Sequence, residues 1–359
     1  MHVPDGMINL PVSAAAGVVA AGAVAVSLRG ARRELGSGPL AEGHGAERTA
    51  PLAGLVAAFV FAVQMLNFPV AAGTSGHLLG GALAAILVGP CTGVLCIAVV
   101  LLMQGILFAD GGLTALGVNI TVMGVVTVIV SYGIFRGLLW ILPRKRRSVT
   151  VSAFVAALVS VPAAAAAFTL LYAIGGTTHI PVGKVLTAMV GVHVLIGIGE
   201  AAITALTVGA VIAVRPDLVH GARGLAAPLK LRVGGELVDA PAPAPVAAAG
   251  SRSPRGLLAA GLGTALLLAG VVSFYASASP DGLEKVAADK GIDRKVEEHA
   301  AADSPLADYG IEDISNTRLS GGLAGMIGVG ATVVVGSGIF YVVHRRRTPA
   351  NAPVATGRS

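Results

Sequence analysis

Residues 185–214 read VLTAMVGVHVLIGIGEAAITALTVGAVIAV, an apolar run in which His193 and Glu200 are the only ionisable side chains. An α-helix rises 1.5 Å per residue, so about 20 apolar residues cross the hydrocarbon core of a bilayer, which is about 30 Å thick. The run is long enough to do so. It therefore predicts a transmembrane helix, with two polar groups inside the membrane.

The same pattern recurs along the chain of 359 residues, which is 55% hydrophobic and only 12% charged. This composition is typical of an integral membrane protein. Glycine is abundant, with 49 residues, and favours close contact between helices in a membrane. We predict an all-α, polytopic membrane helix bundle of about seven spans followed by two C-terminal spans. The apolar runs lie at residues 10–28, 51–66, 78–88, 94–108, 113–135, 151–174, 185–214, 256–276 and 322–343.

Basic residues gather in short clusters between the runs, and such clusters set the orientation of a membrane protein. The net charge of +6 is thus an orientation signal, and it does not indicate nucleic acid as a partner. If runs 78–88 and 94–108 cross as a hairpin broken at Gly89-Pro90, all the clusters fall on the cytoplasmic face. If the two runs form one kinked span, the clusters divide between both faces. We expect the hairpin, with an extracytoplasmic N-terminus at Met1.

Composition also divides the chain into units. Residues 239–249, DAPAPAPVAAA, lack the apolar side chains that could form a core, so they predict a linker. We expect a membrane domain at 1–214, a cytoplasmic Pro/Ala-rich linker at 215–254, and a two-span unit at 255–344 followed by a cytoplasmic tail at 345–359. Between the last two spans, about residues 279–318 form an acidic lobe with ten Asp or Glu against five Lys or Arg.

The N-terminal hexapeptide Met1-His2-Val3-Pro4-Asp5-Gly6 carries a donor set that only a chain terminus offers. The free amine, the amide nitrogen of His2 and the Nδ1 of His2 can hold one metal ion in two fused chelate rings. Three nitrogens in a plane suit Ni(II), Cu(II) or planar Co(II). Pro4 has no N–H and Asp5-Gly6 favours a turn, so we expect a short plug instead of a helix. The alternative is that His2 simply follows the first Met.

His77 is the candidate for the fourth ligand. It lies in a glycine-rich junction, residues 73–81, where the backbone can turn and another segment can approach closely. An imidazole at the edge of an apolar run is costly unless it faces a cavity or a partner. The alternative is a His77 side chain that reaches the outer surface.

Polar residues in and beside the runs are candidates for support of this site. His193 and Glu200 lie seven residues apart and share one helical face, where they could hold the plug or form a structural pair. Gln64 and Asn67 flank the second external loop and are candidates for orienting a ligand histidine through its other nitrogen. Two further candidates for the same role, Asp110 and Asn119, bracket the third external loop.

Two catalytic motifs are absent. The sequence has no G-x-x-x-x-G-K-[ST] loop, so a P-loop ATPase would have to be a partner. It has no H-E-x-x-H motif, so a zincin-type membrane protease is unsupported. The chain itself is therefore not expected to hydrolyse ATP through a P-loop or to cleave peptide bonds as a zincin.

The motifs together resemble a known family. MHVPDG at the start, NFPV at 67–70, TSGHLLGG at 74–81, FADGGLTALGVNI at 108–120 and GVHVLIGIGE at 191–200 are similar to the CbiM/NikM substrate-binding component of energy-coupling factor importers. PDGLE at 280–284 resembles the small accessory component of the CbiN/NikN type, here fused to the larger one.

The resemblance implies a transporter subunit that is no enzyme and carries no cofactor. Such a subunit captures cobalt or nickel as its substrate, with Met1, His2 and His77 as the metal ligands. The resemblance also implies a transmembrane coupling subunit of the CbiQ/NikQ type, ATPase subunits of the CbiO/NikO type, and location in a bacterial plasma membrane. Supply of cobalt for cobalamin biosynthesis is one use that it implies. Two other functions stay open at this point. One is a membrane enzyme that uses His193 and Glu200 as an acid and base, and the other is a scaffold subunit that binds no metal.

Overall fold

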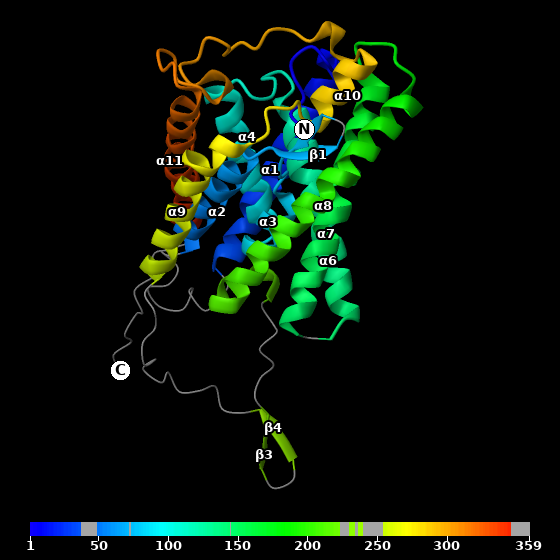
Figure 1. Ribbon diagram of the computed structural model, residues 1–359. Helices are drawn as coiled ribbons and strands as arrows, with labels where there is room; N and C mark the ends of the chain where they lie inside the picture. The colour runs from blue at the N-terminus through cyan, green and yellow to red at the C-terminus, as the bar shows by residue number, and fades with distance from the viewer. Residues whose placement is uncertain are drawn as a thin grey trace, which may run out of the picture.

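The computed structural model describes residues 1–36, 49–71, 73–143, 145–222, 230–233, 236–239 and 254–345. Each predicted apolar run is helical there. The helices are α1 (Leu10–Gly36), α2 (Thr49–Gln64), α3 (Gly81–Val88), α4 (Pro90–Leu107), the continuous α5, η2 and α6 (Leu116–Asn119, Ile120–Val126, Thr127–Ile141), α7 (Arg146–Gly175), α8 (Val182–Val214), α9 (Pro254–Gly270) and α11 (Thr317–Arg345). This confirms the predicted all-α membrane bundle (Figure 1).

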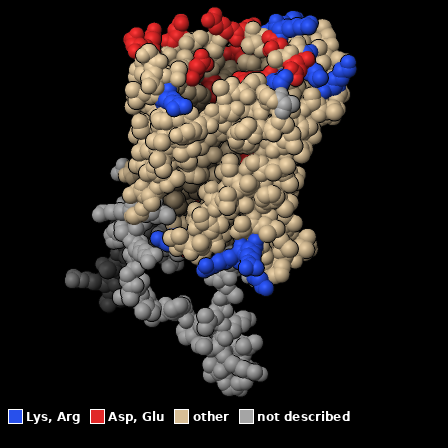
Figure 2. Space-filling model, in the orientation of Figure 1, with Lys and Arg blue, Asp and Glu red and all other residues tan. Residues whose placement is uncertain are grey.

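Seven of these helical segments are long and apolar enough to cross a membrane. α2 and α3 are shorter, and all eight residues of α3 are buried. Large apolar side chains that point outward, such as Val18, Leu206 and Val334, are each more than 70% exposed. On the face shown in Figure 2, a broad band almost free of charged side chains separates two charged ends. Outward apolar groups in such a band are suited to contact with lipid.

α3 and α4 form the predicted hairpin. The break falls at Gly89, which has a φ of +105°, and Pro90 begins α4. A Cβ atom added to Gly93 of α4 would lie 2.9 Å from the backbone nitrogen of Ala85 in α3. Residues eight positions apart in one continuous helix would be about 12 Å apart. The two helices therefore fold back on each other and do not form one kinked span.

The remaining short elements lie mostly at one end of the bundle, which we call the site end. The strands β1 (Phe68–Ala71) and β2 (Thr74–Gly76) pair there as an antiparallel hairpin. The two-span unit adds η5 (Val272–Tyr275), α10 (Gly282–Lys290), η6 (Asp293–Lys295) and η7 (Ala307–Tyr309). The N-terminus lies within the top of the bundle, beneath the level of α10 (Figure 1). That the site end faces outward stays a prediction from the charge distribution.

The two-span unit packs directly on the first unit. α9 and α11 both contact α2, through glycines that admit side chains from the neighbouring helix. Gly54 of α2 meets Ser337 of α11, and Gly328 of α11 meets Phe61 of α2. Small residues at such crossings let membrane helices approach closely. The segment 277–316 then passes across the site end (Figure 1). It contains most of the predicted acidic lobe, which ends where α11 begins, and we call this segment the lobe from here on.

The segment between the units contains more regular structure than the sequence predicts. After α8 come η3 (Pro216–Leu218) and η4 (His220–Ala222). Strands β3 (Lys230–Val233) and β4 (Glu236–Asp239) then form a second antiparallel hairpin. The Pro/Ala-rich stretch 240–249 and the tail 346–359 lie outside the described residues.

Candidate metal centre

The N-terminal segment enters the bundle as a plug. Met1, Val3 and Met7 are each at most 2% exposed. Asn119, at the end of α5, binds the backbone of Val3 on both sides: Val3 N donates to its Oδ1 at 2.8 Å, and its Nδ2 donates to the Val3 carbonyl at 3.0 Å. Asn119 thus positions the plug backbone, whereas the sequence suggested that it orients an imidazole.

Asp5 fixes the turn at the end of the plug. Its carboxylate accepts hydrogen bonds from Thr114 N at 2.7 Å, from the Thr114 hydroxyl at 2.5 Å and from Leu113 N at 3.1 Å. Its backbone carbonyl accepts one from Glu297 N of the lobe at 3.0 Å. Gly6 follows with a φ of +78°. The segment Pro4–Gly6 is therefore a turn tied to two loops, as predicted, and no helix begins before Leu10.

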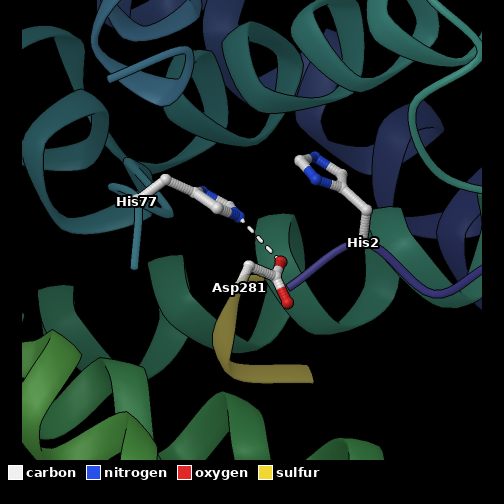
Figure 3. Close-up of side chains that lie close together, drawn as sticks. All are labelled: His2, His77 and Asp281. Atoms are coloured by element: carbon white, nitrogen blue, oxygen red, sulfur yellow. Dashed lines mark ion pairs between the residues drawn. The ribbon is translucent and has the colours of Figure 1, made fainter. Parts of the chain in front are cut away.

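His2 and His77 lie close together at the inner end of the plug (Figure 3), and Met1 joins them there. The Met1 amine contacts His77 Nε2. The rings of His2 and His77 are stacked, with their centroids 5.0 Å apart and their planes 14° apart. Residues separated by more than seventy positions are thus brought into one donor cluster.

Asp281, from the lobe, is the fourth member of the cluster. Its Oδ2 accepts from the Met1 amine at 2.6 Å and lies 3.5 Å from His77 Nε2. Potential ligand atoms of His2, His77 and Asp281 all lie within 4.8 Å of one another. Asp281 is not among the site residues predicted from the sequence. The available signal was its place in the PDGLE motif, but nothing in the sequence places that motif beside the N-terminus.

His77 presents Nε2 to the cluster. Its Nδ1 lies 2.9 Å from the carbonyl oxygen of Leu78, which fixes the tautomer that leaves the Nε2 lone pair free. Burial, together with the nearby positive charge of the amine, lowers the pKa of His77 despite the opposing influence of Asp281. The imidazole is therefore held in the neutral form that binds metals.

His2 is held by two side chains from around the third loop. Its Nδ1 lies 3.0 Å from Asp110 Oδ1, and its Nε2 lies 3.2 Å from Gln104 Oε1. Nδ1 is the nitrogen that the predicted chelate assigns to the metal. Binding through this atom therefore requires the contact with Asp110 to open. Asp110 therefore holds the nitrogen assigned to the metal and not, as the sequence-based prediction has it, the other ring nitrogen, whereas Gln104, which is not among the predicted site residues, contacts that other nitrogen.

Asp110 in turn links both units. The hydroxyl of Tyr309, in the lobe, donates to Asp110 Oδ2 at 2.6 Å. Burial raises the pKa of Asp110, but the charge of His2 and the hydrogen bonds from His2 and Tyr309 outweigh it, so the pKa lies well below its usual value. The carboxylate is therefore ionised beside His2.

Glu200 and His193, both buried on one face of α8, have separate roles. Glu200 accepts from Leu79 N at 2.7 Å and from Gly80 N at 3.2 Å, so it anchors the junction that carries His77. His193 Nδ1 lies 2.7 Å from the carbonyl of Met189, while its Nε2 has no hydrogen-bond partner among the described residues. His193 lines a small void with Met1 and His77.

Gln64 and Asn67 show no hydrogen bond to a histidine among the described residues. Gln64 Nε2 donates to the carbonyl of Leu79 at 2.9 Å, so it supports the same junction as Glu200. The backbone carbonyl of Asn67 accepts from Ser277 N at 2.7 Å, which ties the β hairpin to the lobe. Both residues line a cavity of about 810 Å³ that also reaches His2, His77 and Asp281.

Comparisons with known proteins agree with this architecture. Residues 2–218 match the family model CbiM, described as the cobalt uptake substrate-specific transmembrane region, and residues 255–345 match the PDGLE domain. A protein of Haloquadratum walsbyi, provisionally named a metal transport protein, is 39% identical over 219 residues, which are 61% of this chain and 93% of that protein.

A protein of Archaeoglobus fulgidus, provisionally named a fused nickel transport protein NikMN, is 36% identical over 225 residues, covering 61% of this chain and 68% of the relative. A crystal structure described as a transition metal transporter superposes with a TM-score of 0.51 at 26% identity, covering 60% of this chain and 93% of that chain. The chain therefore belongs to the CbiM family, the multi-pass transmembrane components of energy-coupling factor transporters for cobalt and nickel uptake, and it carries a C-terminal PDGLE domain.

Proposed function

We propose that this chain is the subunit that captures Co(II) or Ni(II) from outside the cell with high affinity, through the Met1 amine, the amide and Nδ1 of His2, and Nε2 of His77. The observation that carries the proposal is the contact of the Met1 amine with His77 Nε2, beside the stacked ring of His2. A terminal amine and two imidazoles rarely meet inside a protein for packing reasons alone, because each loses hydration on burial.

The donor chemistry supports a late transition metal. Nitrogen donors in a plane match the tetragonal preference of Ni(II) and Cu(II), whereas Mg²⁺ and Ca²⁺ prefer oxygen. A neutral His77 needs no deprotonation before it binds, but the amine and the amide of His2 do. Metal binding should therefore release protons and become tighter as the pH rises.

Transport requires partners. The sequence has no P-loop, so ATP hydrolysis would come from two ATPase subunits that act through a transmembrane coupling subunit. Membership of the CbiM family supports this assembly. We place the complex in the plasma membrane, with the site end outward. The family description names cobalt, and the A. fulgidus relative is named for nickel, so we propose either ion as the substrate. Imported cobalt would supply cobalamin synthesis.

The test is metal binding to purified full-length protein with an authentic N-terminus and any tag at the C-terminus. One variant carries an extra Ala before Met1, and another is His2→Ala. Both should lose high-affinity Ni(II) and Co(II) binding, measured by calorimetry and by elemental analysis, because the fused chelate rings cannot form. His179→Ala is the matched control, since His179 is an exposed loop histidine outside the cluster. Unchanged metal stoichiometry in the extended variant would refute the chelate.

A further inference from the structure

The first residues of the PDGLE motif pack against the first unit. Ser75 of β2, two residues before His77, donates its backbone N–H to the Pro280 carbonyl at 2.8 Å and its hydroxyl to the Ser279 carbonyl at 2.7 Å. Leu283 is 1% exposed. Gly282 presses on α8, because an added Cβ would lie 2.7 Å from Ile196 and 3.1 Å from His193 Cε1. The motif is therefore a docking element that leaves no room for a larger side chain between Gly282 and α8.

Within the motif, the two oxygens of Asp281 face different partners. Asp281 is the N-cap of α10: its Oδ1 accepts from Glu284 N at 2.8 Å, and Glu284 completes the capping box by accepting from Asp281 N at 2.9 Å. Its Oδ2 is directed at the Met1 amine and His77. The helix cap thus fixes the direction in which the second oxygen points.

The ion pair between Asp281 and the Met1 amine cannot persist when a metal binds. The amine must give its lone pair to the metal, and it then no longer carries the charge that balances the carboxylate. Asp281 is 7% exposed, and a buried carboxylate without a partner is strongly disfavoured. A divalent cation at the same place would replace the lost partner. With the deprotonated amide of His2, one carboxylate also brings a divalent ion to zero net charge.

We propose that Asp281 Oδ2 is a direct oxygen ligand of the bound cation, so that the metal site is completed by the C-terminal unit. This inference rests on the proposed function. The inference gives the PDGLE motif a chemical role. The helix cap orients one oxygen of Asp281, and Gly282 permits close approach to α8. The carbonyls of Ser279 and Pro280 bind the motif to β2, the strand that leads to His77. A cation held by both units is also shielded on the side of the lobe.

The test compares Ni(II) affinity and the visible absorption spectrum of the Ni(II) complex in full-length protein. Asp281→Asn keeps the N-cap, since Asn caps helices as well as Asp does, but removes the charge. Asp281→Ser keeps a capping oxygen on a side chain too short to reach the cluster. Asp289→Asn is the matched control, because it makes the same change at an exposed site on α10, where Asp289 pairs with Lys285 at 2.5 Å.

Both Asp281 variants should bind Ni(II) about 10- to 100-fold more weakly and shift the absorption bands toward those of a planar four-nitrogen complex. Asp289→Asn should match the wild type in both readouts. Both variants also lose the buried ion pair with the Met1 amine, so their metal-free unfolding temperatures should fall, and a helix content equal to that of the wild type would show that the fold and the cap are preserved. Equal or tighter Ni(II) binding in Asp281→Asn would overturn the inference. Weaker binding with an unchanged absorption spectrum would also overturn it, because the Asp281 carboxylate would then be a nearby counter-ion and not a ligand. A wild-type protein that binds neither Ni(II) nor Co(II) would instead refute the proposed function itself.

Discussion

At the scale of single residues, the candidate metal centre depends on keeping His77 neutral. Burial lowers its pKa, with the charged amine as the second cause. Its Nδ1 is occupied by the Leu78 carbonyl, so a proton on Nε2 would point directly at a positive amine. The environment therefore selects the ligand form of the ring before any metal arrives.

This arrangement predicts a pH dependence of the metal-free protein. The unfolded chain protonates His77 near its ordinary pKa of 6.5, whereas the folded chain resists protonation to lower pH. Below about pH 6.5 the unfolded state binds more protons than the folded state, so the free energy of unfolding should fall as the pH falls through this value. The measurement is the unfolding temperature between pH 7.5 and 5.5. His77→Gln should show a smaller decrease, and an equal decrease in both proteins would contradict the explanation.

At the scale of elements, the site is assembled by helices that contribute no metal ligand. α8 holds the junction between β2 and α3 through Glu200, and α5 holds the plug through Asn119. The sequence identified Glu200 as an unusual ionisable group in a membrane span. Its partners are backbone N–H groups 120 positions away, and no pattern in α8 specifies them.

Replacing Glu200 should therefore damage the site without touching a ligand. Glu200→Ala leaves the buried Leu79 and Gly80 N–H groups unpaired, at a cost of about 1–3 kcal/mol each. We expect lower thermal stability and weaker Ni(II) binding. Thr204→Ala is the control, because Thr204 lies one turn further along α8 and its buried hydroxyl has no hydrogen-bond partner in the part of the chain that the structure describes. Equal effects of the two substitutions would show that Glu200 does not position the junction.

At the scale of the whole molecule, the two units behave as one structure. α9 and α11 pack on α2, and the lobe is tied to the plug, to the β hairpin and to the third loop. The His2 ring is held by Asp110, which is itself held by Tyr309 of the lobe. The covalent link through residues 240–249 is then not what keeps the units together.

Cutting that link tests this conclusion. A protease site inserted within residues 240–249 should allow cleavage into two fragments that co-purify in mild detergent and retain Ni(II) binding. The matched variant is Gly328→Leu, which should disrupt the contact between α11 and α2, since a Cβ at this position would already lie 2.2 Å from Phe61. After cleavage at the same inserted site, the Gly328→Leu protein should separate into its two fragments. Dissociation of the cleaved wild-type chain would contradict the proposed packing.

The sequence alone determined the membrane class and the helices, because a chain in lipid must satisfy its backbone hydrogen bonds internally and therefore forms helices wherever it is apolar. It also determined Met1, His2 and His77 as candidates, because the amine at a chain end and an imidazole are recognisable as donors by their chemistry. These inferences need only residue types and short spacings.

Only the tertiary structure decided which polar groups meet. Asp281 reaches His77 across more than two hundred residues, and it does so because α9 and α11 dock on α2 and bring the lobe over the site. Gln104 and Asp110 hold His2, while Gln64 and Asn67 face other partners. Such contacts depend on helix packing and loop closure, which join distant segments through shape, and local sequence carries no record of that shape.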